Sequence, residues 1–170
     1  MKKSLSILAG LMIVAQPGVA MAQATCKLST LSDFGAVALG TTYAKVPRTL
    51  VLQDSCERTQ LNPNSVCNWL DPRSGIEYTG YEGKIFRKQI EMNAENVSRP
   101  LPFGIRATDR SADVAKKLRA LKNAPQFDVA ADKVTSRGCL KTASVKSFTL
   151  EVAFDSDGAL KTIQVATPTQ

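Results

Sequence analysis

The most constraining feature of the sequence is an alternation of apolar and polar residues late in the chain. Residues 148–154 read Phe-Thr-Leu-Glu-Val-Ala-Phe, so the large apolar side chains recur at every second position. This period is typical of a β-strand with one buried face. The residues Asp-Ser-Asp-Gly at 155–158 predict a turn, after which residues 160–167 return as a second strand. The fold therefore needs an antiparallel sheet with one covered face.

A second hairpin is predicted earlier in the chain. Residues 76–79 form its outgoing strand, residues 80–83 its turn, and residues 84–92 its returning strand, with Phe86, Ile90 and Met92 on one face. The polar stretch 93–102 contains two prolines and is typical of a linker.

The two hairpins belong to a predicted internal repeat. Four ordered pairs of landmarks recur about 70 residues apart. They are Phe34-Gly35 with Phe103-Gly104, Leu50 with Leu118, Cys67 with Cys139, and Gly83 with Gly158. We therefore expect a first unit over residues 25–98 and a second over residues 99–170.

Each unit is expected to begin with a short strand, over 35–39 and 104–107, followed by a helix. In the second unit the helix starts near residues 108–111 and ends before Pro125, with Val114, Leu118 and Leu121 on its apolar stripe. In the first unit Thr41 or Thr42 caps a helix that Pro47 shortens or restarts. The predicted fold class is α+β: two pseudo-repeated strand-helix-hairpin units, with the helices on one face of an antiparallel sheet.

Four cysteines, Cys26, Cys56, Cys67 and Cys139, predict two disulfides. A zinc site is disfavoured because the chain has no histidine and no Cys-x-x-Cys pair. The residues Asn-Pro-Asn at 62–64 predict a turn that brings Cys56 back to Cys67. Cys26 is then left to pair with Cys139 by elimination.

The first 22 residues have the three parts of a secretory signal peptide. Lys2 and Lys3 precede the apolar run 5–15, and small residues allow cleavage after Ala22 or Ala24. A lipoprotein signal ending at Cys26 and an uncleaved anchor are the alternatives. We expect a periplasmic or secreted protein with no membrane span after cleavage, since no second run of about 18 apolar residues follows.

The sequence offers little for catalysis. Without histidine a Ser-His pair is excluded, and no serine is followed three residues later by lysine. Asp155 and Asp157 are better explained by a hairpin turn than by paired acid and base chemistry. We therefore expect no enzymatic activity, no catalytic residues, no metal and no cofactor.

Binding is the remaining class of function. The net charge of +7 falls to +5 without the two signal-peptide lysines, and the surplus lies mainly after Pro100. We expect the partner to be another protein, and the basic surplus favours an acidic protein or an envelope polymer. A solvated helix face and loops are the alternative explanation of the surplus. Nucleic acid is a poor candidate for an exported chain with few aromatic residues.

The pattern Gly-x-Thr-x-x-x-Val-x-x-x-Leu, from Gly40 through Val46 to Leu50, precedes a predicted disulfide loop and a hairpin. This arrangement resembles the tandem repeats of β-lactamase inhibitor proteins and the single-unit lipoproteins of the SmpA/OmlA type. The resemblance implies an inhibitor or immunity-type protein that docks its partner on the open sheet face. The alternative is an envelope-assembly accessory or structural protein.

The contact residues are predicted from the types that interfaces favour, aromatic residues and arginine. Trp69, Tyr81 and Arg87 are the candidate anchors, and packing in the core or in a turn is the favoured alternative for Trp69 and Tyr81. The other face-lining residues expected beside Arg87 are polar: Glu77, Thr79, Gln89, Thr149 and Glu151.

Overall fold

The computed structural model describes residues 31–53, 56, 64–121, 124, 126–139 and 147–168. The predicted signal peptide, its cleavage points and Cys26 lie outside the described residues. Within the described ranges, no helix is both long enough and apolar enough to cross a membrane.

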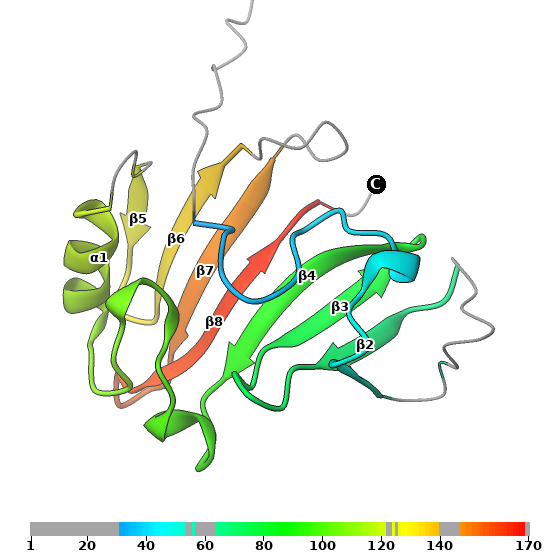
Figure 1. Ribbon diagram of the computed structural model, residues 1–170. Helices are drawn as coiled ribbons and strands as arrows, with labels where there is room; N and C mark the ends of the chain where they lie inside the picture. The colour runs from blue at the N-terminus through cyan, green and yellow to red at the C-terminus, as the bar shows by residue number, and fades with distance from the viewer. Residues whose placement is uncertain are drawn as a thin grey trace, which may run out of the picture.

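The fold is built on one antiparallel sheet of eight strands, in the order β1-β2-β3-β4-β8-β7-β6-β5 (Figure 1). The strands of the first half are β1 (Val51–Gln53), β2 (Cys67–Leu70), β3 (Glu77–Tyr81) and β4 (Lys84–Glu91). Those of the second half are β5 (Phe127–Val129), β6 (Lys133–Gly138), β7 (Phe148–Phe154) and β8 (Leu160–Ala166). Each half is a meander, and the two meanders join where β4 pairs with β8. The division into repeat units at 25–98 and 99–170 stays a prediction.

The predicted fold class was wrong, because the protein is β-rich. The described residues contain a single α-helix, α1 (Ser111–Arg119), and three short 3₁₀ turns: η1 (Tyr43–Lys45), η3 (Asn96–Ser98) and η4 (Pro102–Gly104). The expected helix of the first unit is reduced to η1. Pro47 follows directly after its C-cap residue Val46, and its ring prevents the last turn from continuing as a helix.

The short strands expected over 35–39 and 104–107 do not form. Gly35 and Gly104 have φ angles of 78° and 67°, a left-handed backbone that interrupts an extended strand. Gly35 also lies against the Tyr78 hydroxyl, where a Cβ atom would collide. Both segments are therefore loops.

The two predicted hairpins are present as β3–β4 and β7–β8. In the first hairpin Glu82 and Gly83 both have positive φ, the conformation that a two-residue turn between antiparallel strands requires. One face assignment in β4 was wrong: a register shift interrupts the alternation at Phe86, so Lys88, not Phe86, lies with Ile90 among the fully buried side chains.

One face of the sheet is covered by two separate parts of the chain. Residues 31–50 lie over β3 and β4, where Gly40 donates to Ile85 O at 2.7 Å and Ile85 donates to Thr41 O at 2.9 Å. Helix α1 lies beside β5 and β6 and buries Val114, Ala115 and Leu118 (Figure 1). The apolar side chains of both covers and of the sheet form one continuous core, and no described helix or strand lies over the opposite face.

Candidate functional site

The open face of the sheet is the candidate site, and the strand register arranges its side chains in rows across the strands. Because side chains alternate between faces, residues paired across neighbouring strands share a face. One row runs from β1 to β6 through Gln53, Asn68, Thr79, Arg87, Ala166, Thr149 and Arg137. The next runs from β1 to β5 through Val51, Leu70, Glu77, Gln89, Gln164, Glu151, Thr135 and Asp128.

These rows contain all six polar residues that were predicted to share the open face. Most are half-exposed, and Thr79 is covered by its neighbours. Arginines and glutamates stand in adjacent rows, so the face carries both signs of charge. The arrangement gives no bias toward a strongly acidic partner.

Arg87 is held in place near the middle of the face. Its guanidinium donates from Nε and Nη2 to Thr79 Oγ1, at 3.2 and 3.0 Å. The same group lies over the ring of Phe86, 5.9 Å from its centroid. In the next row Gln89 Nε2 donates to Glu77 Oε2 at 3.3 Å. Such contacts reduce the number of conformations that these side chains lose on binding.

The three predicted anchors lie in different environments. Arg87 is half-exposed on the open face, and Tyr81 lies at the end of β3 with 37% of its surface exposed. Trp69 is fully buried on the covered face, where its ring packs against Tyr43 with 4.9 Å between centroids. Burial raises the pKa of the Tyr43 hydroxyl to about 12, so this group remains a donor to Ser65 O. Trp69 therefore supports the core and does not line the open face.

The predicted Cys56–Cys67 disulfide is confirmed, with the two Cα atoms 5.8 Å apart. It ties the start of β2 to the chain that follows β1. Cys139 is also disulfide-bonded, and its predicted partner Cys26 lies outside the described residues.

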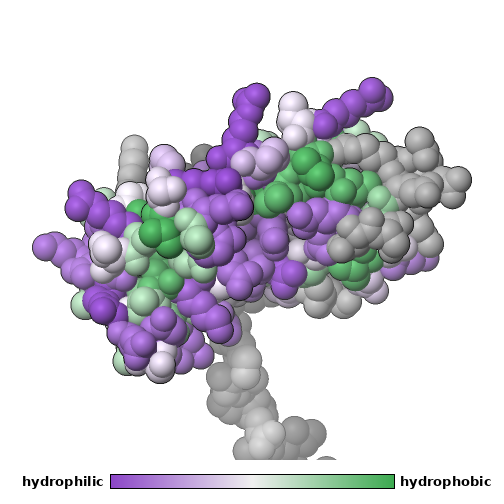
Figure 2. Space-filling model, turned by 90° about the horizontal axis from the view of Figure 1, so that it is seen from below, coloured by the Kyte–Doolittle hydropathy of each residue, from purple (hydrophilic) through white to green (hydrophobic). Residues whose placement is uncertain are grey.

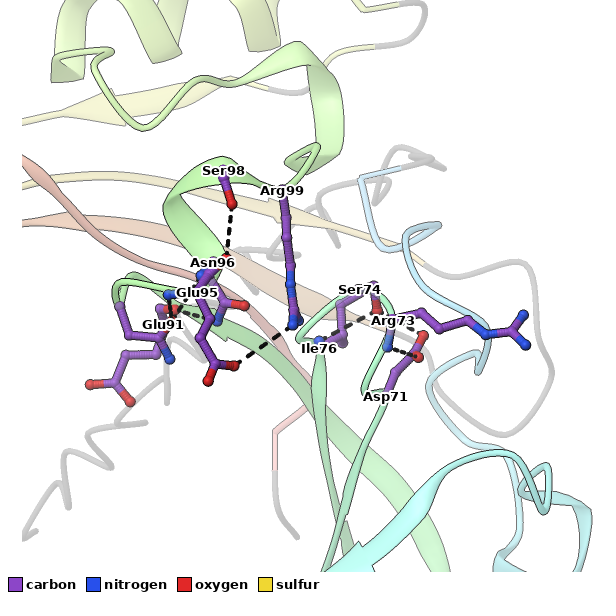
Figure 3. Close-up of polar contacts among 10 residues, drawn as sticks. Asp71, Arg73, Ser74, Ile76, Glu91, Glu95, Asn96, Ser98 and Arg99 are labelled. Atoms are coloured by element: carbon purple, nitrogen blue, oxygen red, sulfur yellow. Dashed lines mark hydrogen bonds and ion pairs between the residues drawn. The ribbon is translucent and has the colours of Figure 1, made fainter.

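A second polar cluster lies at one end of the strands (Figure 3). The turn before β3 is closed by Asp71, whose carboxylate accepts from Arg73 N at 3.0 Å and from Ser74 Oγ at 2.7 Å. Burial acts to raise the pKa of Asp71, but these donors together hold the pKa below its ordinary value. Gly75 packs so closely against Asn96 that a Cβ atom would collide.

The partner of this turn is the polar stretch that was expected to be a linker. Asn96 is buried and donates from Nδ2 to Glu91 O at 2.8 Å, and Arg99 forms an ion pair with Glu95 at 3.8 Å (Figure 3). All these groups bond to one another or to backbone, so the cluster fixes the chain between β4 and η4.

The described residues contain no group of three His, Cys, Asp or Glu side chains placed to hold a metal ion. Asp155 acts as the turn residue that the sequence indicated, since its Oδ1 accepts from Asp157 N at 2.9 Å and Ala159 N at 2.7 Å. Seen from below in Figure 2, the surface is largely hydrophilic, with hydrophobic side chains gathered in two separate areas. A single large hydrophobic patch does not dominate this side.

Comparison with known proteins gives no relative: no family model, curated protein or solved structure matches the chain. The resemblance to β-lactamase inhibitor and SmpA/OmlA-type proteins stays a prediction.

The residues of the open face that sequence reasoning missed include Gln164, Ala166 and Arg137. Their positions depend on the β4–β8 and β6–β7 pairings, which no local pattern specifies. The strand pattern of 160–167 alone could have found Gln164 as a polar, outward residue.

Proposed function

We propose that this protein is an exported, disulfide-bonded, non-enzymatic module that binds another protein through the open face of its sheet. The observation that carries the proposal is the open face itself: rows of half-exposed polar and charged side chains that cross up to eight strands, with no described element over them. Its partner is expected to be a protein with complementary charges of both signs.

The anchor of this surface is Arg87. Arginine and tyrosine are enriched among residues that dominate binding energy. Arg87 is oriented by Thr79 and Phe86, and Tyr81 is exposed on the same hairpin. A sheet surface with a positioned arginine is suited to a partner that is itself folded.

Export is supported by the disulfides. The Cys56–Cys67 bridge and a bonded Cys139 are typical of an oxidising compartment. This agrees with a periplasmic or secreted protein, the compartment that the signal-like first 22 residues predict.

The test is capture of a partner from a periplasmic extract with three immobilised proteins: wild type, Arg87→Glu and Arg119→Glu. Both variants change an arginine to glutamate, but Arg119 is exposed on α1, on the covered side of the sheet. A partner recovered at stoichiometric yield by wild type and Arg119→Glu, and lost by Arg87→Glu, supports the proposal. Equal capture by all three, or no stoichiometric partner, contradicts it.

The identity of the captured protein separates the two functional classes. An envelope enzyme or toxin whose activity falls on binding supports an inhibitor or immunity-type role. Outer-membrane assembly proteins instead support the accessory role that the alternative describes.

A further inference from the structure

Lys88 is a buried lysine that neither the open face nor the disulfides use. It points from β4 into the covered face with 1% of its surface exposed. Its Nζ donates to the carbonyl oxygens of Ser32 and Phe34, the latter at 2.7 Å, and lies 4.8 Å from the centre of the Phe34 ring. Residues 31–34, here called the strap, are thus bonded to the sheet through this amine, and the buried side chains of Leu31 and Phe34 pack in the core beside it.

The environment of Nζ suits a neutral amine. A neutral amine has two N–H donors, and the two strap carbonyls are the only acceptors of a hydrogen bond from Nζ in the described part of the chain. A third ammonium proton has only the Phe34 ring beside it. Burial is the main cause that lowers the pKa of Lys88, to about 8, and the Asp33 carboxylate opposes it.

Few other groups that titrate or carry charge face this amine. The strap contributes exposed Asp33, and β3 contributes Tyr78, which pairs with Lys88. On the other side β8 contributes Val165, which is apolar. Burial raises the pKa of Tyr78, so its hydroxyl stays protonated up to pH 9. Between pH 7 and 9 Lys88 therefore changes its charge and Tyr78 does not.

We propose that the strap is a proton-sensitive closure: it lies tightest on the sheet when the Lys88 amine is neutral, and protonation of this amine favours its release. A released strap hydrates Lys88 and uncovers Phe34 together with the part of the sheet beneath it. The closure therefore couples access to the covered face with the charge of one side chain.

The size of the effect follows from linkage. The released strap leaves Lys88 in water, where its pKa is near 10.5, whereas the closed strap holds the pKa at about 8. The open form therefore binds more protons, and closure strengthens as the pH rises through 8. Between pH 7 and pH 9 the opening equilibrium falls about tenfold.

The test is amide hydrogen exchange of the wild type and two variants at pH 7, 8 and 9, corrected for intrinsic rates. The reporter is the Ala36 amide, which donates to the Tyr78 hydroxyl at 2.8 Å just beyond the strap. The reference is the Gly40 amide, bonded to Ile85 O farther along the same cover. Lys88→Met removes the titrating amine, and Lys84→Met makes the same change at an exposed position of β4.

We expect the protection of the Ala36 amide to be about tenfold higher at pH 9 than at pH 7 in wild type and in Lys84→Met. In Lys88→Met the protection should stay constant. Constant protection in wild type, or an equal change at Ala36 and Gly40, overturns the proposal. Should Lys88→Met fail to fold, Asp33→Asn gives the answer. This substitution removes the carboxylate that favours the ammonium form of Lys88 but breaks no bond to Nζ. The pH at which Ala36 protection changes must therefore move lower. If this pH does not move, the proposal is overturned.

Discussion

We expect the Cys56–Cys67 bridge to stabilise the first meander by an amount that a single substitution can measure. The two cysteines are 11 residues apart in sequence. In the chain-entropy account of disulfides, a loop of this length restricts the unfolded chain by about 2.8 kcal/mol at 25 °C. We expect Cys56→Ala to lower the free energy of unfolding by about this amount. Cys56 is the half-exposed partner, so the buried Cys67 keeps its packing in the core.

Denaturant unfolding measures the loss, with Trp69 as the probe because it is the one tryptophan of the chain and is fully buried. Peptide mapping without reduction must identify Cys67 as the one free thiol, which verifies that Cys67 has not exchanged with the bridge at Cys139. A loss below about 1 kcal/mol would refute the reasoning, because the unfolded chain would then gain little freedom from the cut.

Three further predictions concern the covered side of the sheet. Gly80→Ala should lower the free energy of unfolding by about 1–3 kcal/mol, because the new Cβ meets the Tyr43 ring that packs on Trp69. An unchanged midpoint of thermal unfolding would show that the ring can shift freely. Lys117→Met should cost roughly 1–2 kcal/mol at neutral pH by removing the 2.5 Å ion pair to Asp109. Burial acts to raise the pKa of Asp109, but its donors, led by Lys117, together lower it. The loss of stability in Lys117→Met should therefore vanish as the pH falls through that lowered pKa. A loss of stability that persists in acid contradicts the pairing. Trp69 emission should be blue-shifted in the folded protein and move to the red on unfolding; red emission from the native state would place its ring in water.

The hairpins were predictable because their information is local. In β7 every second residue is buried, as the period-two pattern required, and Asp155 closes the following turn. Helix α1 was found for the same reason, since Val114 and Leu118 share its buried side. The Cys56–Cys67 pairing followed from a short loop with a turn between its cysteines.

The fold class could not be predicted from such local patterns. Pro47 argued against a helix in the first unit. The helix was nevertheless expected there because the internal repeat predicted one in each unit. The edge strands β1 and β5 have three residues each, which is too short for a clear period. Trp69 was a candidate contact because its type is common in interfaces, but packing in the core was the favoured alternative, and the ring is fully buried. Which face it occupies depends on its pairing with Tyr78.

The most direct test of the central claim maps the interface on the captured complex. Carboxylates are labelled with a carbodiimide, and the labelling rates of Glu77 and Glu151 on the open face are compared with that of exposed Asp113 at the start of α1. Open-face binding predicts that complex formation slows the labelling of Glu77 and Glu151 and leaves Asp113 unchanged. Slowing at Asp113, with Glu77 and Glu151 labelled as in the free protein, would contradict it.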